Sequence, residues 1–305
     1  MSPFAEPARK PPLDKKLLSL SPEEFDFLKA QTLIEGKDAL KEHIFDVQRK
    51  AYENRVSLNI DIPQIYGYPC IRLFSFTKLK ISCLPAYRSV LKLVHERSEA
   101  VFLDIGCCFG NDLRKVVADG WPIQNVIGSD LQQGFWDLGH ELFKTTPITY
   151  PAAFIAGDVF DSSLIAPRAI FDEIPQTPRP SLESLVSLTP LQGYVSAIHA
   201  SSFFHLFSEA RQHELAQRLA TLLSPIPGSV LFGTHIGRPE KGIVRGAADE
   251  PSLFSHSPES WRDLWDGQVF EKGIVKVEAH LKQVENLAMK STEPFYFLVW
   301  SVTRL

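Results

Sequence analysis

The sequence has no run of about 20 apolar residues, the length that a helix needs to cross a bilayer. Its first 16 residues are rich in proline and lysine and lack the apolar stretch of a secretory signal peptide. We therefore expect a cytoplasmic protein with no membrane partner.

Cysteine and excess positive charge are also scarce. Only 4 of the 305 residues are cysteine, and Cys70, Cys83, Cys107 and Cys108 form no zinc-type CxxC pair. We therefore expect the thiols to be reduced. Histidine, aspartate and glutamate are not clustered at metal-ligand spacing, so we also predict that the protein holds no metal. The net charge of −4 gives no general basic field, and we expect no nucleic-acid partner.

What is present is an ordinary globular composition, with 44% hydrophobic and 22% charged residues. Ser21, Pro22 and Glu24 form a capping-box pattern that begins a helix. A roughly helical apolar pattern continues to residue 55, interrupted near Gly36, and another helix is expected before residue 97. We interpret residues 1–95 as a tail and a helical cap.

From residue 100 the pattern alternates between strand and helix, which predicts an α/β, Rossmann-like core over residues 96–305. The sheet should have seven strands, mostly parallel with the last antiparallel, flanked by helices. A proline-rich insertion at about 161–192 should lie on the surface, with a short helix near residues 182–188. Ser257 should cap a helix that stops at Gly267. The strands are expected at 100–105, 125–129, 152–156, 195–200 and 229–234, with a final pair in 273–284 and 294–305.

The stretch from Val101 to Asp130 carries the strongest functional signal. Asp104, Gly106 and Gly110 lie where a strand passes into a helix, so the backbone can approach a ligand beside free helical N–H groups. The G-x-x-x-G spacing differs from the G-x-G-x-x-G of dinucleotide sites. A carboxylate before the first glycine suits the cationic methionine end of S-adenosylmethionine, and Asp130, which ends the second strand, suits its ribose hydroxyls.

Other candidate cofactor-binding residues follow neighbouring strands. Asp158 can accept a hydrogen bond from an adenine amino group, while Val159 and Phe160 supply backbone groups and an apolar face. The alternative interpretations give these residues purely structural roles, with Asp130 capping the following helix and Asp158 serving only as a loop residue. Cys107, Leu131 and Ala200 complete the predicted cofactor contacts.

Histidines and aromatic residues are the candidates on the acceptor side. His205 is a possible general base, since imidazole titrates near pH 6.5, although it could equally fix its loop. His199, inside an apolar strand, is interpreted as structural. The predicted substrate contacts are Tyr66, Tyr68, Phe204, His235 and Trp261, with Phe74 and Phe76 as further pocket walls that could equally be core.

With these residues in view, the chain resembles class I S-adenosylmethionine-dependent methyltransferases, and more narrowly fungal secondary-metabolite methyltransferases of the meroterpenoid type. The strings that carry the resemblance are YPCIRLFSF, FLDIGCCFGNDLRK, IGSDLQQGFWDLGHELF, FIAGDVFD, ASSFFHLF and SPESWRDLWD. The resemblance implies the same cofactor contacts at Asp104, Gly106, Gly110, Asp130 and 158–160, with the cap over the acceptor pocket. Cys108 departs from the general pattern, in which a second glycine is common.

We therefore predict methyl transfer from S-adenosylmethionine to an oxygen, carboxylate or hydroxyl, of a small apolar natural product. N-methylation is a variant of this reading. A protein that binds the cofactor without methyl transfer, as a cyclase or scaffold, and an NAD oxidoreductase are the rivals from other classes. The acceptor and the oligomeric state stay open.

Overall fold

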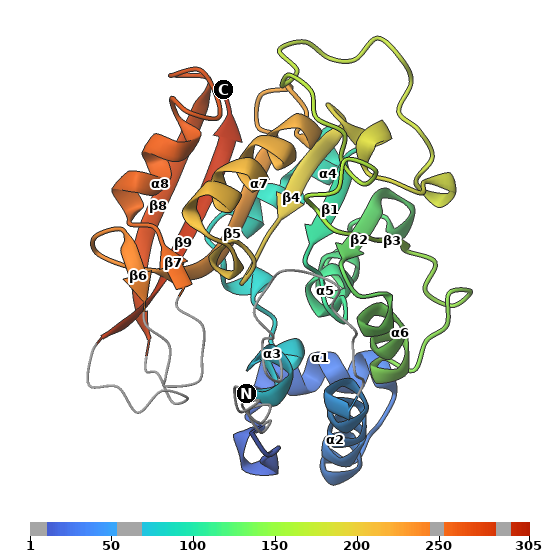
Figure 1. Cartoon of the computed structure of the whole chain (residues 1–305). Coiled ribbons are helices and arrows are strands. Elements are labelled where there is room, and N and C mark those ends of the chain that lie inside the picture. The colour runs from blue at the N-terminus through green and yellow to red at the C-terminus, as the bar shows by residue number, and fades with distance from the viewer. Residues whose placement is uncertain (1–10, 54–68, 245–252, 285–293) are drawn as a thin grey trace, which may run out of the picture.

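A seven-stranded sheet forms the centre of the protein, seen here in a computed structural model (Figure 1) that describes residues 11–53, 69–244, 253–284 and 294–305. The strand order is β3-β2-β1-β4-β5-β9-β8, and β9 runs antiparallel to both of its neighbours. The predicted fold class is confirmed. The strands are β1 (Val101–Ile105), β2 (Val126–Asp130), β3 (Ala153–Ala156), β4 (Val195–His199), β5 (Val230–Gly237), β8 (Val275–Val284) and β9 (Phe295–Arg304).

The parallel strands bring the functional motifs to one edge. In β1 and β4 every residue is buried, as expected for a central parallel strand covered on both faces. The register pairs Asp104 of β1 with His199 of β4. Two polar side chains that are 95 residues apart in the sequence therefore end their strands side by side, at the carboxyl edge where open α/β sheets bind ligands.

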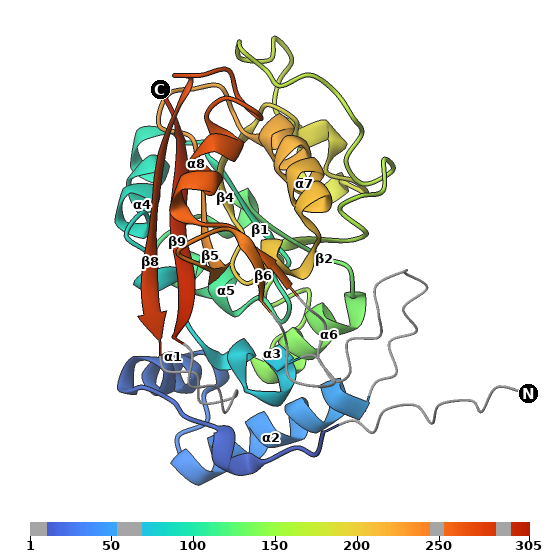
Figure 2. The same ribbon diagram turned by 60° about the vertical axis from the view of Figure 1, so that its left-hand side comes forward.

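Helices cover both faces of the sheet, so that two apolar cores form (Figure 2). The core on one face includes Leu215 of α7 and Trp261 of α8, and the core on the other includes Val90 of α4 and Leu113 of α5. These helices are α4 (Tyr87–Glu96), α5 (Asn111–Ala118), α6 (Gln133–Leu142), α7 (Glu209–Leu222) and α8 (Pro258–Trp265).

The N-terminal helices α1 (Pro22–Thr32), α2 (Lys37–Glu53) and α3 (Pro69–Arg72) lie below the carboxyl edge of the sheet (Figure 1). Their apolar faces form a third core with Phe109 and α6. The ring nitrogen Nε2 of His43 on α2 lies 2.8 Å from the carbonyl oxygen of Leu142 at the end of α6. The helix preceding residue 97, α4, packs on the sheet with α5, and the cap boundary at residue 95 stays a prediction.

The insertion at 161–192 differs from expectation in its second half. Instead of one short helix, two single-turn 3-10 helices form at Leu182–Ser184 and Thr189–Leu191. The leucines that suggested a helix, Leu182, Leu185 and Leu188, serve the core instead: Leu182 and Leu188 are buried in it, and Leu185 is partly buried against it. A small hairpin of β6 (Gly242–Val244) and β7 (Leu253–Ser255) was not predicted. Within the described ranges, no helix is long and apolar enough to span a membrane.

The capping box at the start of α1 gives a first testable prediction. Ser21 Oγ accepts from the Glu24 amide at 3.2 Å, and Glu24 Oε2 accepts from the Ser21 amide at 2.8 Å. Loss of an N-cap hydroxyl costs about 1 kcal/mol, so S21A should lower the free energy of unfolding by that amount in urea. Ser19, exposed and outside the cap, is the control, and an equal loss in S19A would contradict the assignment.

Candidate functional site

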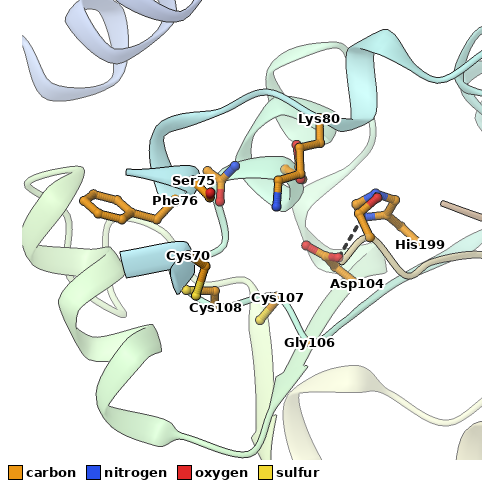
Figure 3. Close-up of a pocket in the computed structure, with 12 residues that line it drawn as sticks. Cys70, Ser75, Phe76, Lys80, Asp104, Gly106, Cys107, Cys108 and His199 are labelled. Carbon is orange, nitrogen blue, oxygen red and sulfur yellow. Dashed lines mark hydrogen bonds and ion pairs between the residues drawn. The ribbon is translucent and has the colours of Figure 1, made fainter. Parts of the chain in front are cut away.

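A pocket opens at the carboxyl edge of β1 and β4, beneath the segment that joins α3 to α4 (Figure 3). The lining residues are Cys70, Ser75, Phe76, Lys80, Asp104, Gly106, Cys107, Cys108, Asn111, Asp112, His199 and Ser201. The walls of the pocket therefore come from the glycine turn, from the first turn of α5, from the end of β4 and from the N-terminal region.

The turn after β1 uses the left-handed backbone region three times. Gly106 and Gly110 both have φ of 70°, and Cys108 has φ of 52°. A Cβ atom at Gly106 would lie 2.6 Å from Cδ2 of Phe203, and one at Gly110 would lie 2.6 Å from Cζ3 of Trp136. The two glycines are therefore required by conformation and by close packing. Cys108 adopts the conformation that the glycine common at this position would favour.

Asp104 and His199 form a buried pair at the floor of the pocket. The Asp104 Oδ1 atom accepts from His199 Nδ1 at 2.8 Å, and His199 Nε2 lies 2.7 Å from Ser201 Oγ. Burial alone would lower the pKa of His199, but the charge and hydrogen bond of Asp104, with the nearby charge of Asp112, raise it overall. His199, interpreted from sequence as structural, thus orients the carboxylate expected to meet the cofactor.

The first turn of α5 holds the N-terminal region against the pocket. Asp112 Oδ1 accepts from the amide of Ile81 at 3.1 Å, and Asn111 Nδ2 donates to the carbonyl of Lys78. Burial raises the pKa of Asp112 to about 6. The side chains of Asn111 and Asp112 thus tie the segment before α4 to the helix that follows the glycine turn.

Sequence reasoning also missed four further residues that line the pocket: Cys70, Ser75, Lys80 and Ser201. Lys80 enters from the segment before α4, and Cys70 lies beside Cys108 (Figure 3). The sulfur of Cys70 accepts a hydrogen bond from the thiol of Cys108. That hydrogen bond lowers the pKa of Cys70. Ser201 lies two residues beyond the end of β4. Periodicity carries no signal for Lys80 or Cys70, because only the packing of the N-terminal region brings them to the strand ends.

Asp130 ends β2 as predicted, and its carboxylate organises the glycine turn. Oδ2 accepts from the amide of Cys108 at 2.9 Å and Oδ1 accepts from the amide of Gln132 at 3.0 Å. Burial raises the pKa of Asp130. Each carboxylate oxygen has a second lone pair for a ribose hydroxyl. Leu131 is half-buried beside it, and both ligand roles stay predictions.

Asp158, Val159 and Phe160 follow β3 and differ in their surroundings. Asp158 Oδ1 accepts from the amide of Phe160 at 2.9 Å, and Val159 is buried in the sheet core. The half-buried ring of Phe160 stacks under the guanidinium of Arg211, whose Cζ lies 4.0 Å from the ring centroid. Phe160 is thus the member of this group that offers an apolar face, and their adenine contacts stay predictions.

Ala200 and His205 lie beyond the end of β4, outside the pocket lining. Ala200 is fully buried, and its amide donates to the carbonyl of Phe232 at 3.0 Å. Burial, with the charge of Lys80, lowers the pKa of His205 to about 3. His205 is therefore neutral at pH 7 but a weak proton acceptor, because a general base works best with a pKa near the operating pH.

Three predicted substrate residues come together in one aromatic cluster. Phe204, His235 and Trp261 are fully buried, with Trp261 centred 4.9 Å from Phe204 and 4.7 Å from His235. Trp300 Nε1 donates to His235 Nδ1 at 2.9 Å, which places the proton of neutral His235 on Nε2. Among the described residues, neither His235 Nε2 nor Trp261 Nε1 has a hydrogen-bond partner.

The remaining predicted acceptor contacts fall elsewhere. Tyr66 and Tyr68 lie outside the described residues. Phe76 lines the pocket, whereas Phe74 is buried in the core of the N-terminal helices. In the part of the chain that the structure describes, no three histidine, cysteine or acidic side chains are grouped to hold a metal ion.

The sheet order and the pocket at the glycine turn define the class: a Rossmann-like methyltransferase fold. Residues 13–77 match the family described as "Meroterpenoid methyltransferase N-terminal domain". The O-methyltransferase phiE of a fungal species (strain ATCC 74256) is 33% identical over 73% of this chain, which spans 66% of that protein's length. The Asnovolin E/Chermesin D methyltransferase nvfJ of Aspergillus novofumigatus is 30% identical, over 78% of this chain and 77% of nvfJ.

The chain therefore belongs to the family of fungal meroterpenoid-type methyltransferases that includes nvfJ. The resemblance predicted from the sequence is confirmed. Among solved structures, magnesium protoporphyrin IX methyltransferase from Synechocystis PCC 6803 is similar at 12% identity with a TM-score of 0.44, over 94% of this chain and 100% of that chain.

Proposed function

We propose that the protein moves the methyl group of S-adenosylmethionine to an oxygen of a small apolar natural product. The observation that carries the proposal is the turn from Asp104 to Gly110, where backbone in left-handed conformation passes a buried carboxylate and enters a helix. Family membership supports methyl transfer, and the name of phiE supports oxygen as the accepting atom.

The residues present fit this cofactor. Gly106 lines the pocket, and the positive φ of Gly106 and Gly110 with their close packing on Phe203 and Trp136 holds the turn between Asp104 and α5 in a tight form. The ammonium of the methionine end would meet Asp104, the ribose would meet Asp130, and the adenine would lie beside Phe160. S-adenosylmethionine supplies an electrophilic methyl group on a sulfonium; the chain itself supplies position, orientation and exclusion of water.

The predicted acceptor contacts Phe204, His235 and Trp261 are fully buried and do not line the pocket at the glycine turn, so the proposal of an oxygen acceptor rests on family membership and on the name of phiE. A carboxylate is already ionised at pH 7 and needs no base, so orientation alone, with effective molarities of about 10⁵ M or more, would suffice. A hydroxyl acceptor needs a proton acceptor, the role proposed for His205 as a weak base.

The proposal is tested by binding and by turnover. Titration calorimetry should show binding of S-adenosylhomocysteine and no comparable binding of NADH. Incubation with methyl-labelled S-adenosylmethionine and a panel of apolar acids and phenols should give labelled product by mass spectrometry. Tight NADH binding without any response to S-adenosylhomocysteine would overturn the proposal. Firm cofactor binding with no labelled product across the panel would favour a binding protein that does not transfer methyl.

A substitution at Asp130 tests the ribose contact. D130N keeps one acceptor oxygen but removes the charge, and hydrogen bonds to charged groups are worth about 1.5–3 kcal/mol. We therefore expect S-adenosylhomocysteine to bind about tenfold more weakly in calorimetry. Asp137, exposed on α6, provides the control D137N. An affinity in D130N equal to that of the wild type would count against the assignment.

A further inference from the structure

Lys80 places a cation in the crevice from outside the sheet. Its ammonium lies 3.2 Å from Ser202 Oγ, in the loop after β4, and points toward the carboxylate of Asp104 (Figure 3). Among the described residues that line the pocket, Lys80 is the only lysine or arginine. The side chain is half-buried, so its charge acts where water screens it less than at the surface.

Among the described residues Lys80 has no carboxylate partner, although two carboxylates line the same pocket. Over the described ranges, no carboxylate oxygen lies within 4.0 Å of its ammonium nitrogen. Asp104 is engaged by His199, and Asp112 by the amide of Ile81. An ammonium has three N–H donors, of which Ser202 takes one. The remaining donors face the crevice, where an anionic group of a ligand would satisfy them.

The charges at this end of the crevice match an amino acid. Asp104 offers a fixed negative charge and Lys80 a positive one, both lining one pocket. A free α-amino acid end carries an ammonium and a carboxylate on one carbon atom. We propose that Lys80 binds the α-carboxylate of the cofactor's methionine end while Asp104 receives its ammonium. This inference rests on the proposed function and extends it to the N-terminal region.

The backbone beside Lys80 is held on both sides. The carbonyl of Lys78 accepts from Asn111, and the amide of Ile81 donates to Asp112 at 3.1 Å. Both anchors belong to the first turn of α5, directly after the glycine turn. Because the segment is fixed there, binding of a carboxylate by Lys80 joins the N-terminal region to the cofactor. The site should then discriminate between ligands that carry the α-carboxylate and ligands that lack it.

The test compares S-adenosylmethionine with decarboxylated S-adenosylmethionine, which keeps the amine and lacks only the carboxylate. Calorimetry without acceptor gives both affinities for wild type, K80M and K80R. A hydrogen-bonded charge pair is worth about 1.5–3 kcal/mol, so K80M should bind S-adenosylmethionine about 10- to 100-fold more weakly. The decarboxylated analogue should bind K80M no more weakly than it binds wild type, and K80R should restore part of the preference.

Two controls separate this role from a loss of folding or of the whole site. K92M removes an exposed lysine of α4 and should leave both affinities unchanged. Near-ultraviolet circular dichroism should show native packing in K80M. A K80M protein that retains the wild-type preference for the carboxylate, or that loses both ligands equally, overturns the inference while the proposed function stands. Wild-type protein that binds neither ligand overturns the proposed function itself.

Discussion

Replacing Gly106 with alanine is expected to abolish measurable cofactor binding, with a loss in affinity for S-adenosylhomocysteine of at least about 100-fold. The residue has φ of 70°, which costs an L-residue about 1–2 kcal/mol. The added Cβ would also lie 2.6 Å from the ring of Phe203. Relief of that clash must move either the turn or the loop after β4, and both form the crevice.

The control is a glycine with the same kind of backbone and open space beside it. Gly273 has φ of 87°, and a Cβ there would meet no atom of the described residues within 4 Å. G273A should therefore lose about 1 kcal/mol of stability in urea, from backbone strain alone, and should bind S-adenosylhomocysteine like the wild type. A G106A protein with wild-type affinity would show that the turn is not the ligand cradle.

The D104N variant is expected to lose about 3 kcal/mol of stability at pH 5.5, because it breaks a buried charged pair. Asp104 is 3% exposed and His199 is 1% exposed. Asparagine has nearly the same shape but cannot stabilise an imidazolium. Cofactor affinity should fall as well, since the ammonium of the methionine end would lose its carboxylate.

The pH dependence of this loss has a definite sign. The pKa of His199 in the folded protein is raised above the unfolded value of about 6.5, so the pair stabilises most below pH 6.5. Its contribution disappears as the pH rises through the folded-state pKa. The difference in unfolding free energy between wild type and D104N should therefore be largest near pH 5.5 and should shrink at alkaline pH.

Two comparisons make this experiment specific. Lys80 and Asp112 also face His199, but both are present in the two proteins and their effects cancel in the difference. The exposed pair of Asp46 and Arg49 provides the control, because D46N should cost less than about 1 kcal/mol at any pH. A loss in D104N that stays constant from pH 5.5 to 9 would contradict the ion-pair assignment.

Local pattern predicted much of the architecture. The seven strands, the cap of α1 at Ser21 and the cap of α8 at Ser257 lie where the sequence placed them. Each of these features depends on hydrophobic periodicity, on a capping residue or on a glycine, and such signals act over only a few residues. The segment around Leu182 and Leu188 was misread because leucines at helical spacing also serve irregular chain that packs on a core.

The sequence by itself determined the fold class, the glycine turn and the two aspartates at the ends of β1 and β2. Local sterics and strand direction are sufficient for those features. Only the tertiary structure decided which side chains join Asp104: His199 arrives through the register of β1 and β4, and Lys80 arrives through the packing of the N-terminal region. Lys80 is 24 residues and His199 is 95 residues from Asp104 along the chain, and interactions between sequence neighbours cannot specify contacts over such separations.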